Sequence, residues 1–112
     1  MRMAKYIWYT AIFSLAALLL FACALDPTPT DEQILQAVAA SNATEANPLE
    51  LVYEEMQVPH RYPGRAGAVL WVPDKSVQRN YSVAYDQKTD TFYIKSYITL
   101  VLGEDGVYRE QR

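Results

Sequence analysis

Residues 91–102, Thr-Phe-Tyr-Ile-Lys-Ser-Tyr-Ile-Thr-Leu-Val-Leu, alternate between two kinds of side chain. Because successive side chains of a β-strand point to opposite faces, this alternation predicts one long strand with an apolar face and a more polar face. The apolar face is expected to carry Phe92, Ile94, Ile98, Leu100 and Leu102, interrupted only by Ser96. The other face is expected to carry Tyr93, Lys95, Tyr97, Thr99 and Val101.

The segments around this strand predict an antiparallel β-meander of about four strands. Residues 79–86 alternate in the same way, and the apolar run 68–72 is typical of a buried strand. Polar residues at 86–90 predict a turn, and Gly-Glu-Asp-Gly at 103–106 predicts a tight hairpin. Residues 107–110 are then expected to return as a short edge strand.

Helix signals precede the strands. Thr30 and Gln33 have the spacing of a capping box, which predicts a helix over residues 31–40. Asn-Pro-Leu-Glu at 47–50 is a second start signal, with proline at the first helical position. The alternation of residues 49–53 also fits a strand, and the cap favours a helix there.

Prolines and glycine divide the rest of the chain. Residues 58–65 contain two prolines and a glycine, which predicts an irregular loop. The prolines and threonines of residues 23–30 predict an extended tether that does not pack. Residues 31–112 are therefore expected to form one small α+β domain, with one or two short helices followed by the meander.

The beginning of the chain has the layout of an export signal. Arg2 and Lys5 give a positive start, and residues 6–25 carry no formal charge. Leu20-Phe21-Ala22-Cys23 resembles the lipobox of bacterial lipoproteins, in which a small residue precedes a cysteine that is acylated. A thiolate suits this chemistry because it is the most nucleophilic side chain near neutral pH.

The resemblance implies a signal peptide over residues 1–22 and a lipid of the palmitate type on Cys23. It also implies an envelope protein at the outer membrane, facing the periplasm. Two alternatives stay open. Ala22-Cys23-Ala24 also fits ordinary signal-peptidase cleavage, and twenty uncharged residues are long enough to stay as an uncleaved anchor in the cytoplasmic membrane.

Composition restricts the function of the remaining 90 residues. They carry 13 acidic and 8 basic residues, so their charge argues against nucleic acid as a partner. Cys23 is the single cysteine and His60 the single histidine, so no intramolecular disulfide or histidine-pair metal site can form. We expect no cofactor, no metal and no catalytic residues, because no nucleophile motif or metal-ligand spacing is visible.

Two groups of residues are candidates for binding a partner. His60, Arg61, Tyr62 and Arg65 lie in the predicted proline-rich loop, where paired guanidinium donors suit a carboxylate or a phosphate. Tyr93, Lys95 and Tyr97 share the more polar face of the long strand and have the amphipathic character typical of interfaces.

These observations favour a non-enzymatic, membrane-anchored lipoprotein of the bacterial cell envelope that acts as a protein-interaction or assembly module. The alternative is a secreted small-ligand binder or small hydrolase with a polar site near Glu54, His60 and Arg61. The two hypotheses differ in geometry. The alternative requires those three side chains to converge, whereas the interaction module requires an exposed patch on the sheet.

Overall fold

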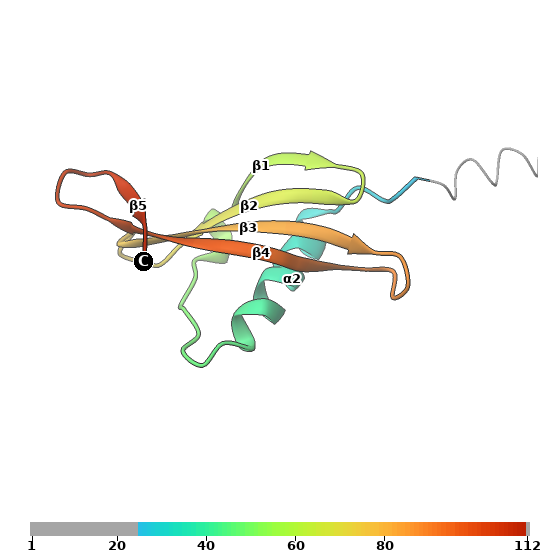
Figure 1. The fold of residues 1–112 in the computed structure, drawn as a ribbon, viewed down its shortest axis with the longest axis horizontal. Helices are drawn as coiled ribbons and strands as arrows, with labels where there is room; N and C mark the ends of the chain where they lie inside the picture. The colour runs from blue at the N-terminus through green and yellow to red at the C-terminus, as the bar shows by residue number, and fades with distance from the viewer. Residues whose placement is uncertain (1–24, 112) are drawn as a thin grey trace, which may run out of the picture.

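The computed structural model describes residues 25–111, and Cys23 and the signal-like leader lie outside these residues. Within them, one helix precedes a five-stranded antiparallel sheet in which each strand pairs with the next along the chain (Figure 1). The α+β class is confirmed, with five strands instead of about four. The elements are α2 (Asp31–Ala43), a 3-10 turn (Tyr53–Glu55), β1 (Gln57–Tyr62), β2 (Arg65–Trp71), β3 (Val77–Asp86), β4 (Thr91–Leu102) and β5 (Tyr108–Glu110).

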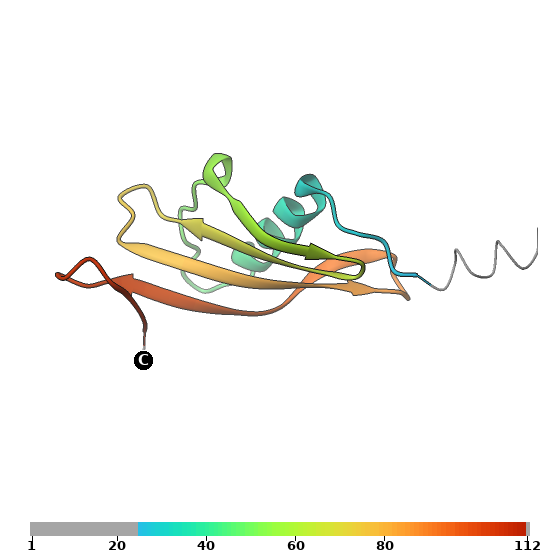
Figure 2. The same ribbon diagram turned by 90° about the horizontal axis from the view of Figure 1, so that it is seen from above.

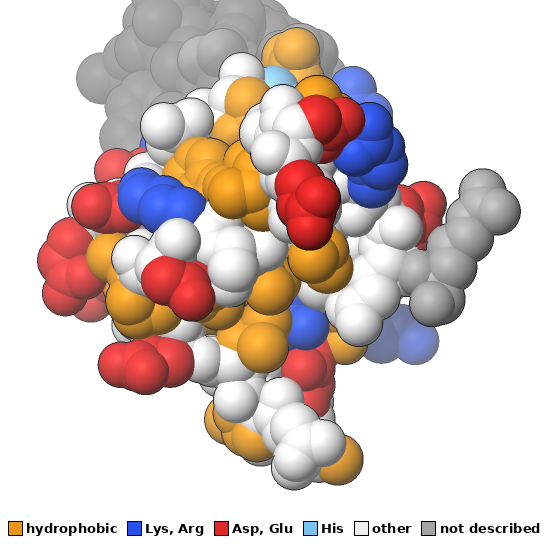
Figure 3. Space-filling view, turned by 90° about the vertical axis from the view of Figure 1, so that its left-hand side faces the viewer, with side chains coloured by type: hydrophobic (Ala, Val, Ile, Leu, Met, Phe, Trp, Pro, Cys, Tyr) orange, Lys and Arg blue, Asp and Glu red, His pale blue; other side chains and the backbone are white. Residues whose placement is uncertain are grey.

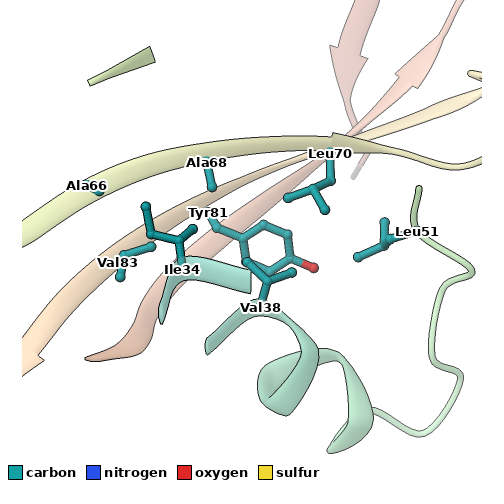
Figure 4. Packing of buried hydrophobic residues seen from close by; sticks show 8 residues of the cluster. All are labelled: Ile34, Val38, Leu51, Ala66, Ala68, Leu70, Tyr81 and Val83. Atoms are coloured by element: carbon teal, nitrogen blue, oxygen red, sulfur yellow. The ribbon is translucent and has the colours of Figure 1, made fainter. Parts of the chain in front are cut away.

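Helix α2 packs against one face of the sheet, which we call the covered face (Figures 1 and 2). The opposite side, the open face, has no described element over it. The core lies between α2 and the middle strands (Figure 4). Its buried members are Ile34, Val38, Leu51, Ala66, Ala68, Leu70, Tyr81 and Val83. Small alanines on β2 let the helix approach the sheet closely, so a short chain can still exclude water from this contact.

The capping box that begins α2 is confirmed. Thr30 N–H donates to Gln33 Oε1 at 2.9 Å, and Gln33 N–H donates to Thr30 Oγ1 at 3.2 Å. The helix continues to Ala43, three residues beyond the predicted end. Near that end, the buried Asn42 side chain donates to the Leu49 carbonyl at 2.8 Å and accepts from its N–H at 3.0 Å.

The second predicted helix is wrong. Only Tyr53–Glu55 forms a 3-10 turn, and residues 48–52 before it have no regular structure. Leu51 is buried in the core, and Val52 N–H donates to the Trp71 carbonyl at 2.9 Å. Contact with the end of β2 therefore outweighs the local cap signal, as tertiary packing commonly does for short segments.

The irregular loop predicted at 58–65 is also wrong, because β1 and β2 form a hairpin there. Pro59 is compatible with this strand because β1 is an edge of the sheet, where a missing N–H breaks no ladder. Pro63 and Gly64 make the turn, and Gly64 has a φ of +78°, which glycine adopts without strain.

A bulge in β4 changes which side chains share a face. Ser82 pairs with Ser96, but Val83 pairs with Ile94, so Lys95 is an additional residue in the strand. Before the bulge, the covered face carries Phe92 and Ile94. After it, the covered face carries Tyr97, Thr99 and Val101, and the open face carries Tyr93, Ser96, Ile98, Leu100 and Leu102. The predicted sharing of one face by Tyr93 and Tyr97 is therefore wrong.

Residues 26–30 pack on the domain, contrary to the prediction of a free tether. Pro29 is fully buried, and Gly64 N–H donates to the Pro27 carbonyl at 2.8 Å. Arg61 donates to the Pro29 carbonyl at 2.8 Å and forms an ion pair with Asp31. We call residues 26–30 the N-terminal clamp.

The clamp lies at the end of the sheet that carries the β1–β2 and β3–β4 turns, where Gln87 donates to Asp26 Oδ1 at 2.9 Å. We call this the clamp end. The opposite, hairpin end carries the β2–β3 loop and the β4–β5 hairpin, which extends past α2 (Figure 1). No helix within residues 25–111 combines the length and the apolar character that crossing a membrane requires.

Candidate functional site

Strand pairing arranges the side chains of the open face in rows that cross the sheet. The row of four strands that lies nearest the clamp end is Tyr62, Arg65, Ala84 and Tyr93, and only the pair Asp86 and Thr91 lies beyond it. The next row is His60, Gly67, Ser82 and Ser96. Four of the seven predicted binding residues lie in these two rows: His60, Tyr62, Arg65 and Tyr93. The face that no element of residues 25–111 covers thus collects aromatic, basic and hydroxyl side chains.

The His60 ring lies directly on Gly67. A Cβ atom built at Gly67 would be 2.3 Å from His60 Cε1, so no larger residue fits there without moving the imidazole. The His60 and Tyr62 rings stack with centroids 5.9 Å apart. Arg65 places its guanidinium 5.1 Å from the centroid of Tyr62, which is cation–π distance. These three side chains support one another along the β1–β2 hairpin.

Two shallow hollows flank His60 on the open face. One, of about 420 Å³, is lined by His60, Tyr62, Arg65, Ala66 and Ser82. The other, of about 250 Å³, is lined by His60, Asn80, Tyr81, Ser82, Ser96, Tyr97 and Ile98. Both are open to solvent. Side chains of a docking protein fit such depressions better than a small ligand, which needs an enclosed site.

Arg65 differs from the other described arginines. Arg61, Arg79 and Arg109 form ion pairs with Asp31, Glu45 and Asp105. Within residues 25–111, Arg65 makes no ion pair, so its guanidinium donors are available to a carboxylate or a phosphate.

Toward the hairpin end, the open face becomes aliphatic. Ile98 and Leu102 remain 44% and 38% exposed, and they lie on the same open face as Leu100. Trp71 lies in the row that crosses Gln78 and Leu100, and Lys75 places its ammonium 5.2 Å from the Trp71 ring centroid. The open face is therefore amphipathic along its length, which is typical of protein interfaces.

The other predicted site residues lie elsewhere. Arg61 points to the covered face and holds the N-terminal clamp. Lys95 is the bulge residue, and Tyr97 is on the covered face beside Tyr81, with ring centroids 5.5 Å apart. His60 and Arg61 thus lie on opposite faces of one strand, so the alternative site with Glu54 is not assembled.

A buried arginine on the covered face was not predicted. Arg79 is 6% exposed and donates to Thr99 Oγ1 at 3.2 Å and Glu45 Oε1 at 3.0 Å. Burial opposes its charge, but hydrogen bonds with Tyr81 and Glu45 outweigh this and raise the pKa of Arg79. The Arg79 guanidinium also lies over the Tyr97 ring, 4.4 Å from its centroid. A hydrogen bond with Glu45 raises the pKa of the Tyr97 hydroxyl. The single signal in the sequence was a basic residue within an alternating strand.

Both edges of the sheet carry features that discourage strand addition. On β1 these are Pro59 and an irregularity in pairing between Gln57 and His60. At the other edge, β5 pairs with residues 100–102 of β4. The rest of β4 has no described strand on that side, and it carries the bulge at Lys95. Proline, bulges and lysine are the usual protections of edge strands, so the open face is a better docking surface than the edges.

Within residues 25–111, no group of histidine, cysteine and acidic side chains is arranged to hold a metal ion. Every buried side-chain polar atom described there has a hydrogen-bond partner. Comparison with protein families, curated proteins and solved structures finds no match to this chain.

Proposed function

We propose that this protein is a lipid-anchored, non-enzymatic component of the bacterial cell envelope whose domain binds another envelope protein through the open face of its sheet. The lipid on Cys23 keeps the domain at the membrane, and the open face supplies recognition. The observation that carries the proposal is the amphipathic open face, which carries His60 and Tyr93 at one end and the exposed Ile98 and Leu102 at the other.

Anchoring is supported by the lipobox-like run and by the positive, uncharged and small-residue regions that surround it. Stable attachment to a bilayer requires two signals such as two acyl chains, since each buried methylene contributes about 0.8 kcal/mol. Replacement of Cys23 with Ala is expected to release the protein from membranes or to block its maturation. Unchanged membrane fractionation together with an unmodified N-terminal peptide would refute the anchoring.

Recognition by the open face is tested by photo-crosslinking in living cells. A photoreactive amino acid is placed at Tyr93 or Ile98, both exposed on the open face, and at Gln36 on the solvated side of α2 as the matched control. We expect one discrete product from the first two positions, identified by mass spectrometry as an envelope protein, and none from Gln36. Equal yields at all three positions, or no product at any, would argue against the open face.

The chemistry of the partner is tested in the same cells. Ile98→Asp places a charge in the aliphatic part of the open face and is expected to abolish the product formed from Tyr93. Glu32→Lys, which changes charge on an exposed position of α2, is the control and is expected to leave that product unchanged.

A further inference from the structure

We propose that, in the anchored protein, the clamp end of the sheet rests on the lipid headgroups, with Tyr62 and Arg65 in contact with the phosphates of zwitterionic lipids. This inference rests on the anchoring proposed above and goes beyond it, because it assigns an orientation and a second, lipid-facing surface to the domain. The open face toward the hairpin end then remains available to the protein partner.

The first step is the length of chain between the anchor and the folded domain. From Cys23 to Asp26 there are three residue steps, which span at most about 10 Å when fully extended. From Asp26 onward the chain is held on the domain by three contacts. Gln87 donates to Asp26, Gly64 N–H donates to the Pro27 carbonyl, and Pro29 is buried. If residues 6–25 instead stay as an uncleaved anchor, the membrane segment ends at Leu25, directly before the same contacts. The clamp end therefore cannot move far from the bilayer surface.

The second step is the chemistry of this end. Leu25 is 64% exposed and Tyr62 is 50% exposed, and Tyr62 stands beside the turn that the clamp contacts. Tyrosine has an apolar ring and a polar tip, which suits the boundary between headgroups and acyl chains. Arg65 has no ion pair within residues 25–111, and a guanidinium donates to phosphate through two parallel hydrogen bonds.

The third step concerns the acidic residues at the clamp end, which select the type of lipid. Asp26 accepts from Gln87, Asp86 accepts from Lys88 N–H at 2.9 Å, and Asp90 accepts from the Tyr85 hydroxyl. These three carboxylates outnumber the cations Arg65 and Lys88. A strongly anionic surface would repel them, so the phosphate of phosphatidylethanolamine is the expected contact.

The hairpin end lies far from the membrane in this orientation. Along β2, Trp71 is six residues beyond Arg65, or about 20 Å at the usual rise of a strand. Along β4, Leu102 is eleven residues beyond Thr91, or about 36 Å. Figure 3 views the molecule from the hairpin end, where hydrophobic, acidic and basic side chains lie intermingled on the surface.

The test measures the distance of two turns from the headgroups. Thr89, in the β3–β4 turn at the clamp end, and Glu104, in the β4–β5 turn at the hairpin end, are both exposed. In the acylated protein Cys23 is blocked, so Thr89→Cys or Glu104→Cys provides one thiol for a fluorophore. The lipidated protein is placed in phosphatidylethanolamine and phosphatidylcholine vesicles whose headgroups carry a quencher. We expect several-fold stronger quenching at position 89 than at position 104.

Two further variants separate orientation from anchoring. A ten-residue Gly-Ser insertion between Ala24 and Leu25 lies before the contacts of Asp26 and Pro27 and is expected to remove the difference between the two positions. Tyr62→Ser combined with Arg65→Ser is expected to lower quenching at position 89, whereas Lys95→Ser is not. Equal quenching at 89 and 104 in vesicle-bound protein would overturn the orientation while the anchoring stands. Protein that does not float with the vesicles would overturn both.

Discussion

Arg79 Nη1 donates to Glu45 Oε1 at 3.0 Å, which joins the loop after α2 to the middle of the sheet. The Arg79 side chain is 7% exposed and that of Glu45 is 18% exposed, so this contact is largely shielded from water. Glu45→Ala leaves a buried guanidinium without its carboxylate and is expected to lower the free energy of unfolding by about 2 kcal/mol. Urea denaturation checks the change.

The matched control for that variant is Glu50→Ala, since Glu50 is exposed and is expected to change stability by less than about 0.5 kcal/mol. Similar losses for both variants would mean that the ion pair with Arg79 contributes nothing specific.

The contact of His60 with Gly67 predicts a local rearrangement. Gly67→Ala forces the imidazole away from the sheet, because the new Cβ would otherwise be 2.3 Å from His60 Cε1. As the ring is exposed and can rotate, the loss of stability is expected to stay below about 1 kcal/mol. The measurement is the NMR shift of the His60 ring protons, together with the crosslinking yield from Tyr93.

Both readouts are expected to change in Gly67→Ala. In a background of His60→Ala, the same glycine substitution is expected to have no further effect on crosslinking, because the displaced group is gone. Independent, additive losses in the double variant would contradict this account.

The N-terminal clamp is expected to contribute to stability. Arg61→Ala removes the donor to the Pro29 carbonyl and the ion pair with Asp31, at a cost of about 1 kcal/mol. Limited proteolysis is expected to cut the clamp faster in this variant, since its residues lose their attachment. Arg109→Ala, which breaks an exposed pair with Asp105, is the control and is expected to leave the free energy of unfolding nearly unchanged.

Titration of Tyr85 is expected at high pH. A hydrogen bond with the Asp90 carboxylate, more than burial, raises the pKa of Tyr85 from 10.0 to about 12. Since the folded pKa lies above the unfolded one, this contribution to stability is complete below pH 10 and is lost as the pH rises toward 12. Ultraviolet titration checks the value, and Asp90→Asn is expected to return it toward 10. A high-pH transition that persists in Asp90→Asn would exclude this cause.

The two protected edges predict self-association when their protection is removed. Pro59→Val restores a backbone donor on β1, and Lys95→Val removes the charge from the bulge of β4. We expect the double variant to form dimers or larger species by light scattering after gel filtration. Lys88→Val removes the same charge from a turn and is expected to elute and scatter light as the parent protein does.

Much of the fold follows from local patterns in the sequence. The capping box of Thr30, the turn at 86–90 and the alternation of β3 depend on neighbouring residues, and each is found where it was predicted. The bulge at Lys95 could not be predicted, because the apolar residues of β4 form two overlapping alternating series. Either the even-numbered or the odd-numbered residues can form the covered face of a strand. Pairing with β3 places the even-numbered Phe92 and Ile94 there before the bulge, and the odd-numbered residues 97–101 after it.

The candidate site was predicted in part for the same reason. His60, Tyr62 and Arg65 were recognised by residue type, but their grouping with Tyr93 needed the register of four strands. Arg61 was assigned to the same group although it faces the helix, since a loop was predicted where a strand exists. Periodicity also missed the role of Arg79, because a buried charge interrupts the apolar series and resembles a solvated position.

The order of the strands, in which each pairs only with the next along the chain, has a consequence for how the chain folds. Four successive hairpins can close by contacts that are short in sequence, and such local contacts favour rapid folding. Residues 26–43 are synthesised before the strands on which they find their contacts. The N-terminal clamp and α2 therefore complete their packing only after the strands that they contact have been made.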